Sequence, residues 1–130
     1  MSAKFQSLLY TLVGLFVGAV GGATLHAQTS TPPAFLIGEN DVHDMQTFKT
    51  YGSQVPATLV AYGGHFLAAG GRTQVLEGQA PPNTFVILQF PSMDKAKAWY
   101  DSPEYQKIMP LRHAAATSRV FIAEGKSAAP

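Results

Sequence analysis

Apolar residues recur along this chain with two spacings, and each spacing predicts a different kind of element. Short apolar runs bounded by glycine or proline are typical of β-strands, whereas apolar residues three and four positions apart are typical of helices. The first spacing predicts strands at residues 35–39, 65–69, 84–90 and 119–124. We expect the second strand to bend at Gly70 and Gly71 and to continue over residues 73–77.

The helical spacing is found first between the first two strands. Its apolar face consists of Met45, Phe48, Tyr51, Val55, Leu59 and Tyr62. Asp41 and Asp44 precede this face and are suited to cap its first turn. Proline lacks the amide hydrogen that a helix interior requires, so we expect Pro56 to break or kink the helix near Val55.

A second helical stretch lies between the third and fourth strands, and two prolines divide it. Ser92 is positioned to cap its start, and Trp99 lies on its apolar stripe. Ser102 is a suitable cap for a new helix beginning at Pro103, because proline is favoured at the first helical position. We expect Pro110 to interrupt the helix once more.

The order strand, helix, strand, strand, helix, strand predicts an α+β domain of the ferredoxin-like βαββαβ type, with both helices on one face of an antiparallel sheet. The third strand is apolar on both sides, since Phe85 and Ile87 point one way and Val86 and Leu88 the other. A monomer rarely exposes so large an apolar face. We therefore expect a second copy to cover it, giving a homodimer through the sheet face, a dimeric α+β barrel. The alternative is that residues 70–83 fold over this face.

The N-terminal segment has the pattern of an export signal. Lys4 precedes an uncharged run over residues 5–25, and the small residue Ala27 follows. We expect cleavage after Ala27 and a periplasmic or secreted domain. The alternative is an uncleaved membrane anchor, since the run is long enough to span a bilayer and contains glycines four positions apart. We expect the chain to contact a membrane only if this segment is not cleaved.

These patterns divide the chain into four parts. They are a signal peptide at 1–27, a flexible lead-in at 28–33, a ferredoxin-like domain at 34–125 and a disordered tail at 126–130.

Composition narrows the possible functions. The chain has 130 residues with 9 Lys+Arg, 8 Asp+Glu and a net charge of +1. Loss of the signal would leave 103 residues with eight basic and eight acidic side chains. The domain would then have no net positive charge to attract nucleic acid. The absence of cysteine excludes a thiol nucleophile, a disulfide framework and a zinc–thiolate site.

Several strings in the chain resemble one family. They are Tyr62-Gly63-Gly64-His65-Phe66-Leu67, Val75-Leu76-Glu77-Gly78, Phe90-Pro91-Ser92-Met93, Ala98-Trp99-Tyr100-Asp101-Ser102-Pro103-Glu104-Tyr105-Gln106 and Leu111-Arg112-His113-Ala114-Ala115-Ala116. Together they resemble the domain-of-unknown-function family 1330, over residues 34–125. The resemblance implies a ferredoxin-like fold that dimerises through its sheets, within the dimeric α+β barrel superfamily. It implies no reaction.

Candidate ligand-binding residues are two arginines and two aromatic residues. Arg72 and Arg112 are suited to hold a carboxylate by paired hydrogen bonds. Trp99 and Tyr105 are suited to line an aromatic pocket, although aromatic residues at helical spacing more often belong to the core. The competing interpretation of Arg112 is a structural salt bridge.

Candidate catalytic residues are Glu77 and His113. Glu77 would be a general base if its surroundings raised its pKa, and the competing interpretation is an ion pair with Arg72 or Arg112. His113 would move a proton near neutral pH, and the competing interpretation is a solvent-facing residue at a helix end.

No metal or cofactor is expected, because the histidines lack the spacing of metal ligands. Two functions follow as hypotheses. The first is an exported binding protein for a small apolar or aromatic carboxylate. The second is a cofactor-free oxygenase or isomerase of the dimeric α+β barrel type.

Overall fold

The structure of the protein is a computed structural model that describes residues 30–127. Its strands are β1 (Ala34–Val42), β2 (His65–Ala69), β3 (Thr84–Phe90) and β4 (Ala116–Glu124). Its helices are α1 (Met45–Leu59), α2 (Met93–Tyr100) and α3 (Pro103–Ala115), with a short 3₁₀ helix, η1 (Val60–Tyr62), after α1. The predicted α+β class and the βαββαβ order are confirmed, with the second predicted helix divided into α2 and α3.

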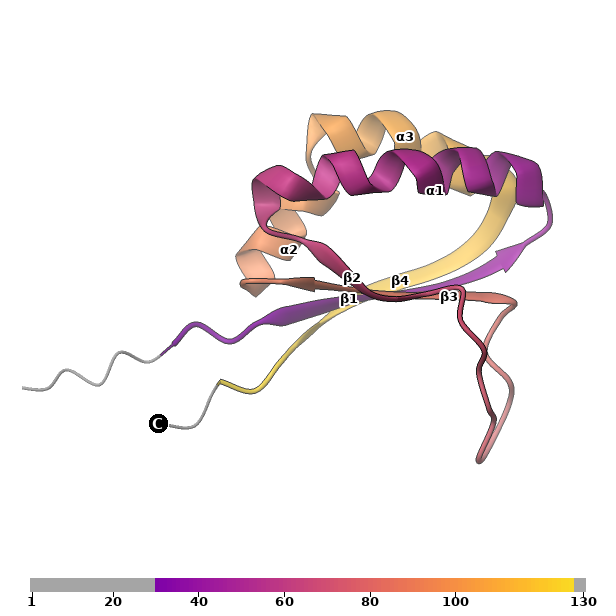
Figure 1. Ribbon diagram of the computed structural model, residues 1–130, viewed down its shortest axis with the longest axis horizontal. Coiled ribbons are helices and arrows are strands. Elements are labelled where there is room, and N and C mark those ends of the chain that lie inside the picture. Colours follow the sequence, from indigo (N-terminus) through magenta and orange to yellow (C-terminus); the bar gives the residue numbers. More distant parts are fainter. Residues whose placement is uncertain (1–29, 128–130) are drawn as a thin grey trace, which may run out of the picture.

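The strands form one antiparallel sheet in the order β2-β3-β1-β4. Leu36 on β1 lies opposite Leu88 on β3 and Ile122 on β4, so these apolar side chains share a face. The helices cover this face, with α1 beside α3 (Figure 1). Both described ends of the chain lie at the same end of the sheet (Figure 1).

The sequence signals at the helix starts act as predicted. The carboxylate of Asp44 accepts hydrogen bonds from the backbone N–H and the hydroxyl of Thr47, and these bonds hold the pKa of Asp44 below its ordinary value. Ser92 and Ser102 cap α2 and α3 in the same way, each accepting from a backbone N–H three residues later. Asp41 does not cap a helix but lies in β1.

The two interior prolines do not interrupt their helices as the sequence predicts. α1 runs through Pro56 to Leu59, and α3 runs through Pro110 to Ala115. Buried residues flank each proline, including Val55 before Pro56 and Arg112 after Pro110. Packing of these side chains against the sheet outweighs the single backbone hydrogen bond that each proline removes.

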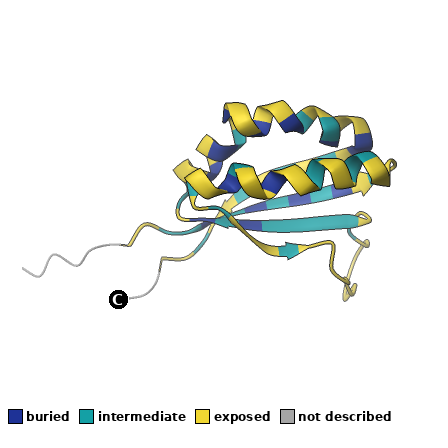
Figure 2. Ribbon diagram, turned by 45° about the horizontal axis from the view of Figure 1, so that its top comes forward, coloured by how far each residue is buried: buried dark blue, intermediate teal, exposed yellow. Residues whose placement is uncertain are grey.

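The core lies between the helices and the covered face of the sheet, where buried positions face one another (Figure 2). Trp99 is at its centre, with its ring centroid 4.0 Å from that of Tyr105 and 5.5 Å from that of Phe90. The indole N–H donates to the hydroxyl of Thr58, 2.9 Å away. Trp99 therefore joins α1, α2, α3 and β3.

Residues 70–83, between β2 and β3, form a long projection that we call the arm. The predicted continuation of β2 over residues 73–77 is wrong for the described chain, because no neighbouring strand pairs with this segment. The arm also does not cover the second face of the sheet. It extends beyond that face (Figure 1), and Phe121 on β4 remains 44% exposed there.

The predicted signal peptide, the first part of the lead-in and most of the predicted tail lie outside the described residues. Within residues 30–127, none of the helices has both the length and the apolar character that crossing a membrane requires.

Candidate functional site

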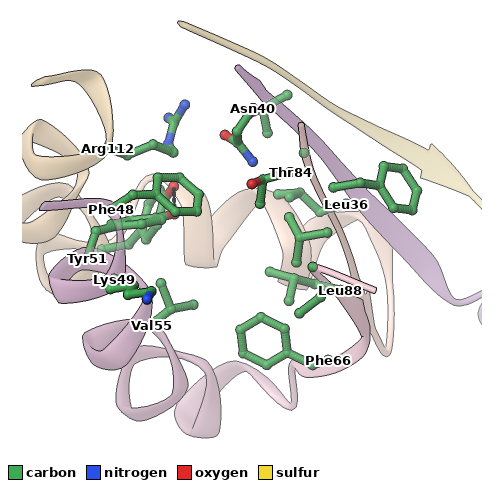
Figure 3. Close-up of a pocket in the computed structure, with 18 of the residues that line it drawn as sticks. Leu36, Asn40, Phe48, Lys49, Tyr51, Val55, Phe66, Thr84, Leu88 and Arg112 are labelled. Atoms are coloured by element: carbon green, nitrogen blue, oxygen red, sulfur yellow. Dashed lines mark hydrogen bonds between the residues drawn. The ribbon is translucent and has the colours of Figure 1, made fainter. Parts of the chain in front are cut away.

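A cavity of about 450 Å³ lies between α1, α3 and the covered face of the sheet (Figure 3). It is lined mainly by apolar side chains, including those of Leu36, Phe48, Val55, Phe66, Val86, Leu88, Trp99 and Val120. Its size and apolar lining are typical of sites for small organic ligands.

Two glycines help to keep this space open. Gly38 on β1 lies opposite Val86 on β3, and a methyl group at position 38 would approach the Val86 side chain to 2.8 Å. Gly52 lies on α1 at the cavity, and a methyl group there would meet no atom within 4 Å. A larger side chain at position 38 would therefore require the Val86 side chain to move, whereas one at position 52 would enter the cavity.

Arg112 is the buried charged group at the polar end of the cavity, whose lining also includes Lys49 on α1. Its side chain is on α3 and is directed toward the same end as Asn40 (Figure 3). Only 4% of the residue is exposed, and its Nε has no hydrogen-bond partner. Among the described residues, no carboxylate pairs with it. A terminal guanidinium nitrogen of Arg112 lies 3.3 Å from Nε2 of His113.

Two phenol groups accompany this guanidinium. The hydroxyls of Tyr51 on α1 and Tyr105 on α3 are 3.0 Å apart. Burial acts to lower the pKa of Arg112, but the oxygens of Tyr105 and Tyr51 outweigh it and the net shift is upward. Burial, together with Tyr105, raises the pKa of Tyr51 well above its ordinary value. At neutral pH Arg112 is therefore a cation and Tyr51 a protonated phenol.

Asn40 supplies a neutral polar group on the opposite wall. It is 2% exposed, and its Oδ1 accepts a 2.7 Å hydrogen bond from the hydroxyl of Ser118. This bond fixes the amide, so that its Nδ2 hydrogens remain to be donated. The polar end thus offers a fixed cation and neutral donors, a combination that suits an anionic oxygen.

The sequence-predicted site residues fall into two groups in the structure. Trp99, Tyr105 and Arg112 line the cavity. His113 does not line it but contacts Arg112. Their functional roles remain predictions.

Arg72 and Glu77 belong to the exposed arm and do not line the cavity. Neither residue forms a salt bridge with another residue of the described chain. Glu77 therefore does not converge with Arg112 and Tyr105, as a shared catalytic site would require.

Sequence reasoning missed Asn40 and assigned Tyr51 only to the helix core. The signal available for Asn40 was its place in the alternation of inward and outward positions along β1. It shares the inward face of this strand with Leu36 and Gly38. A polar amide at an inward position of an apolar strand indicates either a buried hydrogen bond or a site. No group of three or more His, Asp or Glu side chains suited to a metal ion is present within residues 30–127.

Comparisons with known proteins agree with the fold. The sequence profile of a family described as "Domain of unknown function (DUF1330)" matches residues 33–126. No curated protein matches the sequence.

Solved structures with a similar fold share little sequence with this chain. A protein of unknown function from Rhodopseudomonas palustris, RPA0582, has a TM-score of 0.61 at 16% identity, covering 73% of this chain and 83% of that one. SnoaB, a cofactor-independent oxygenase from Streptomyces nogalater, has a TM-score of 0.54 at 16% identity, covering 77% and 99%. A dimeric protein of unknown function and ferredoxin-like fold from Bacteroides fragilis has a TM-score of 0.51 at 11% identity, covering 71% and 95%.

Proposed function

The chain belongs to the DUF1330 family of domains of unknown function, and within that family we propose that it binds a small anion with an apolar, preferably aromatic, body. The anionic group would lie against Arg112 and Asn40. The apolar body would occupy the rest of the cavity.

The observation that carries this proposal is a buried cation with no anionic partner. Burying an unpaired charge is costly, and proteins normally offset the cost with a counter-ion. Arg112 is 4% exposed, and no carboxylate of the described chain is within ion-pair distance. A ligand anion would supply the missing charge and hydrogen-bond acceptors.

The shape of the ligand follows from the remainder of the cavity. Apolar side chains from the sheet and from α1 form most of its walls, and Trp99 and Tyr105 add aromatic surface. Aromatic ligands bury large apolar areas and stack against such rings. A fused two-ring carboxylate combines that body with the required charge.

The test compares 2-naphthoate with 2-naphthamide, its neutral isostere, by calorimetry on protein purified from cells that express the full chain. We expect binding of the carboxylate to be about 10- to 100-fold tighter, the usual contribution of a charge-assisted hydrogen bond. Equal affinity for the two compounds, or no binding of either, would overturn the proposal.

Variants of two arginines locate the effect. Arg112→Gln is expected to remove the preference for the carboxylate, and Arg112→Lys to retain part of it. Arg119→Gln is the matched control, because Arg119 pairs with Glu39 at 2.7 Å and does not line this cavity. If Arg119→Gln abolished the preference as well, the preference could not be assigned to Arg112 in the cavity.

The second candidate is a cofactor-free oxygenase or isomerase, and one observation favours it. The groups that support it are neutral donors and a fixed cation in an apolar space, which stabilise negative charge on a substrate enolate. No carboxylate and no imidazole lines the cavity, so the substrate would need to ionise readily by itself. Oxygen uptake with readily ionised polycyclic phenols tests this candidate, and Arg112→Gln should then lower turnover.

We also propose that two copies associate through the uncovered face of the sheet. Ile37 on β1 lies between Ile87 on β3 and Phe121 on β4, forming an apolar strip that no described helix covers. A protein of similar fold from Bacteroides fragilis is described as dimeric, which supports the association of two copies. Light scattering on the purified protein is expected to give the mass of a dimer, and Phe121→Glu to give a monomer. A monomeric wild type would overturn the proposal.

Export remains a prediction from the sequence. If residues 1–27 are a cleaved signal, protein recovered after expression of the full chain in a bacterium should be periplasmic and begin at Gln28. Mass spectrometry of the intact protein separates this outcome from an uncleaved anchor. A soluble cytoplasmic product that retains Lys4 would contradict both.

A further inference from the structure

We propose that the arm, residues 70–83, crosses to the second copy of the chain, where residues 73–77 pair as a β-strand with the free edge of β4. The proposal rests on the sheet-face dimer described above. It adds an exchanged strand that would close the barrel from both sides.

The first reason is a strand pattern without a partner. Residues 73–77, Thr-Gln-Val-Leu-Glu, have the composition of a short strand, yet no strand of the same chain pairs with them. Leu76 is 86% exposed and Val75 is 47% exposed. Adjacent apolar residues at the end of a projection are typical of a segment that is covered in an assembly.

The second reason is that the arm is held in its projecting position at both ends. At its start, the N–H of Gly70 donates to the carbonyl of Phe85, and Gly70 adopts a φ of 62° that favours glycine. At its end, the Asn83 amide accepts from the N–H of Val42 at 2.9 Å and donates to the carbonyl of Val42 at 3.0 Å. These bonds direct the arm past the uncovered face of the sheet (Figure 1).

The part of the arm that leads back to β3, residues 79–82, which we call the returning limb, also lies beside the uncovered face. Residues 79–82 line a shallow groove together with Glu39, Asp41 and Arg119. Glu39 and Arg119 lie opposite each other on β1 and β4, at the uncovered face. Anything that packs on this face is therefore flanked by the arm.

The third reason is an unprotected edge that is long enough to pair with the whole of residues 73–77. β4 spans Ala116–Glu124 and pairs with β1 along one side only, because it ends the sheet. A long free edge invites pairing with another chain, and native proteins usually cover it. An added strand would use its backbone groups in the manner of β-augmentation.

Symmetry brings the arm and this edge together. β2 and β4 are at opposite edges of the sheet. If two sheets pack face to face about a two-fold axis parallel to the strands, the β2 edge of one copy lies over the β4 edge of the other. The arm leaves the sheet at β2 and β3, so it would reach the partner's β4, and each dimer would contain the contact twice.

Proline substitutions test the pairing, because proline removes the backbone N–H that a strand donates. Successive N–H groups of a strand point to opposite sides, so one of Gln74→Pro and Val75→Pro must remove a bond to β4. That variant is expected to weaken dimerisation at least about tenfold, since the contact occurs twice per dimer. Gln74→Ala is the matched control, because it keeps the backbone N–H, and it should leave the dimer unchanged.

Hydrogen exchange of the full chain, combined with light scattering, separates the possible outcomes. Protection of the amides of residues 73–77 in a dimer, lost on dilution to the monomer, supports the proposal. A dimer in which these amides exchange freely, and in which neither proline variant weakens association, overturns the arm exchange but leaves the sheet-face dimer intact. A monomer at all concentrations overturns both.

Cross-linking gives an independent test, because the natural chain has no cysteine. A tagged Val75→Cys variant is mixed with an untagged Phe121→Cys variant and oxidised. A disulfide-linked heterodimer is expected if the arm of one copy lies beside β4 of the other. Its absence, with homodimeric disulfides across the two-fold axis as the sole products, would contradict the proposed place of the arm beside β4 of the second copy.

Discussion

The hydroxyl of Tyr51 lies 3.0 Å from the hydroxyl of Tyr105, and this contact joins α1 to α3 at the wall of the cavity. The two helices have no other side-chain hydrogen bond to each other in the part of the chain that the structure describes. The rings also meet edge to face, with centroids 6.4 Å apart. The pair therefore holds the two helical walls of the cavity at a fixed separation.

Removing this hydrogen bond should destabilise the protein modestly. Tyr51→Phe and Tyr105→Phe are each expected to lower the free energy of unfolding by about 1 kcal/mol, the usual net contribution of one hydrogen bond. The double variant should cost little more than either single variant, because the same bond is lost.

Urea titrations followed by circular dichroism measure the unfolding free energies of all three variants. Tyr100→Phe is the control and should change stability little, since the Tyr100 hydroxyl has no hydrogen-bond partner among residues 30–127. Strictly additive losses would show that the two hydroxyls do not interact.

The protein is also expected to lose stability in alkali through Tyr51. Its pKa in the folded protein is raised by burial, whereas an unfolded tyrosine ionises near pH 10. Above about pH 10 the unfolded chain loses this proton while the folded chain keeps it, so the free energy of unfolding falls by up to about 1.4 kcal/mol per pH unit. Below that pH the group contributes no pH dependence.

Tyr51→Phe isolates this contribution. The difference in unfolding free energy between wild type and variant should be constant from pH 7 to 9 and should shrink above pH 10. A difference that stays constant through pH 11 would mean that Tyr51 ionises equally in the folded and unfolded states.

The sequence predicted the fold better than it predicted the site, for a physical reason. Strands and helix caps are determined by nearby residues, and the strand at Thr84–Phe90 and the caps Asp44, Ser92 and Ser102 were all predictable from local patterns. The cavity depends on side chains brought together from β1, α1 and α3, which no local pattern relates. Arg112 was identifiable as an anion-binding residue, but its lack of a carboxylate partner required the tertiary structure.

The errors in the local predictions have the same origin. Pro56 and Pro110 disfavour a helix locally, but buried neighbours on the same helices hold the backbone in place. Residues 73–77 favour a strand locally, yet a strand forms only beside another strand. In each case tertiary or intermolecular contacts decide the outcome.

Two glycines should respond oppositely to alanine. Gly52 is inside α1, and a methyl group there meets no atom within 4 Å, so Gly52→Ala should stabilise the protein by about 0.5 to 1 kcal/mol through helix propensity. A methyl group at Gly64 would lie 2.5 Å from the buried ring of Phe90 and 2.9 Å from Leu59, so Gly64→Ala should destabilise it by about 1 to 3 kcal/mol. Thermal and urea unfolding measure both. A stable Gly64→Ala protein would indicate that the side chains of Phe90 and Leu59 can move away from position 64 without cost.

The hydrogen bond between Trp99 and Thr58 should show strong coupling in a double-mutant cycle. Trp99 is 1% exposed, and its indole N–H donates to the hydroxyl of Thr58 at 2.9 Å. Thr58→Val would therefore leave a buried donor unpaired. We expect this change to cost about 1 to 3 kcal/mol in the wild type. In a Trp99→Phe background, where no N–H remains, the same change should cost about 1 kcal/mol less.

Circular dichroism is the appropriate signal, because the Trp99→Phe substitution removes the chain's one tryptophan. Thr50→Val is the control on the same helix, since the Thr50 hydroxyl bonds only to the carbonyl of Gln46 among the described residues and its loss should change stability by less than about 0.5 kcal/mol. Equal costs of Thr58→Val in both backgrounds would mean that the bond contributes nothing specific to the packing of Trp99.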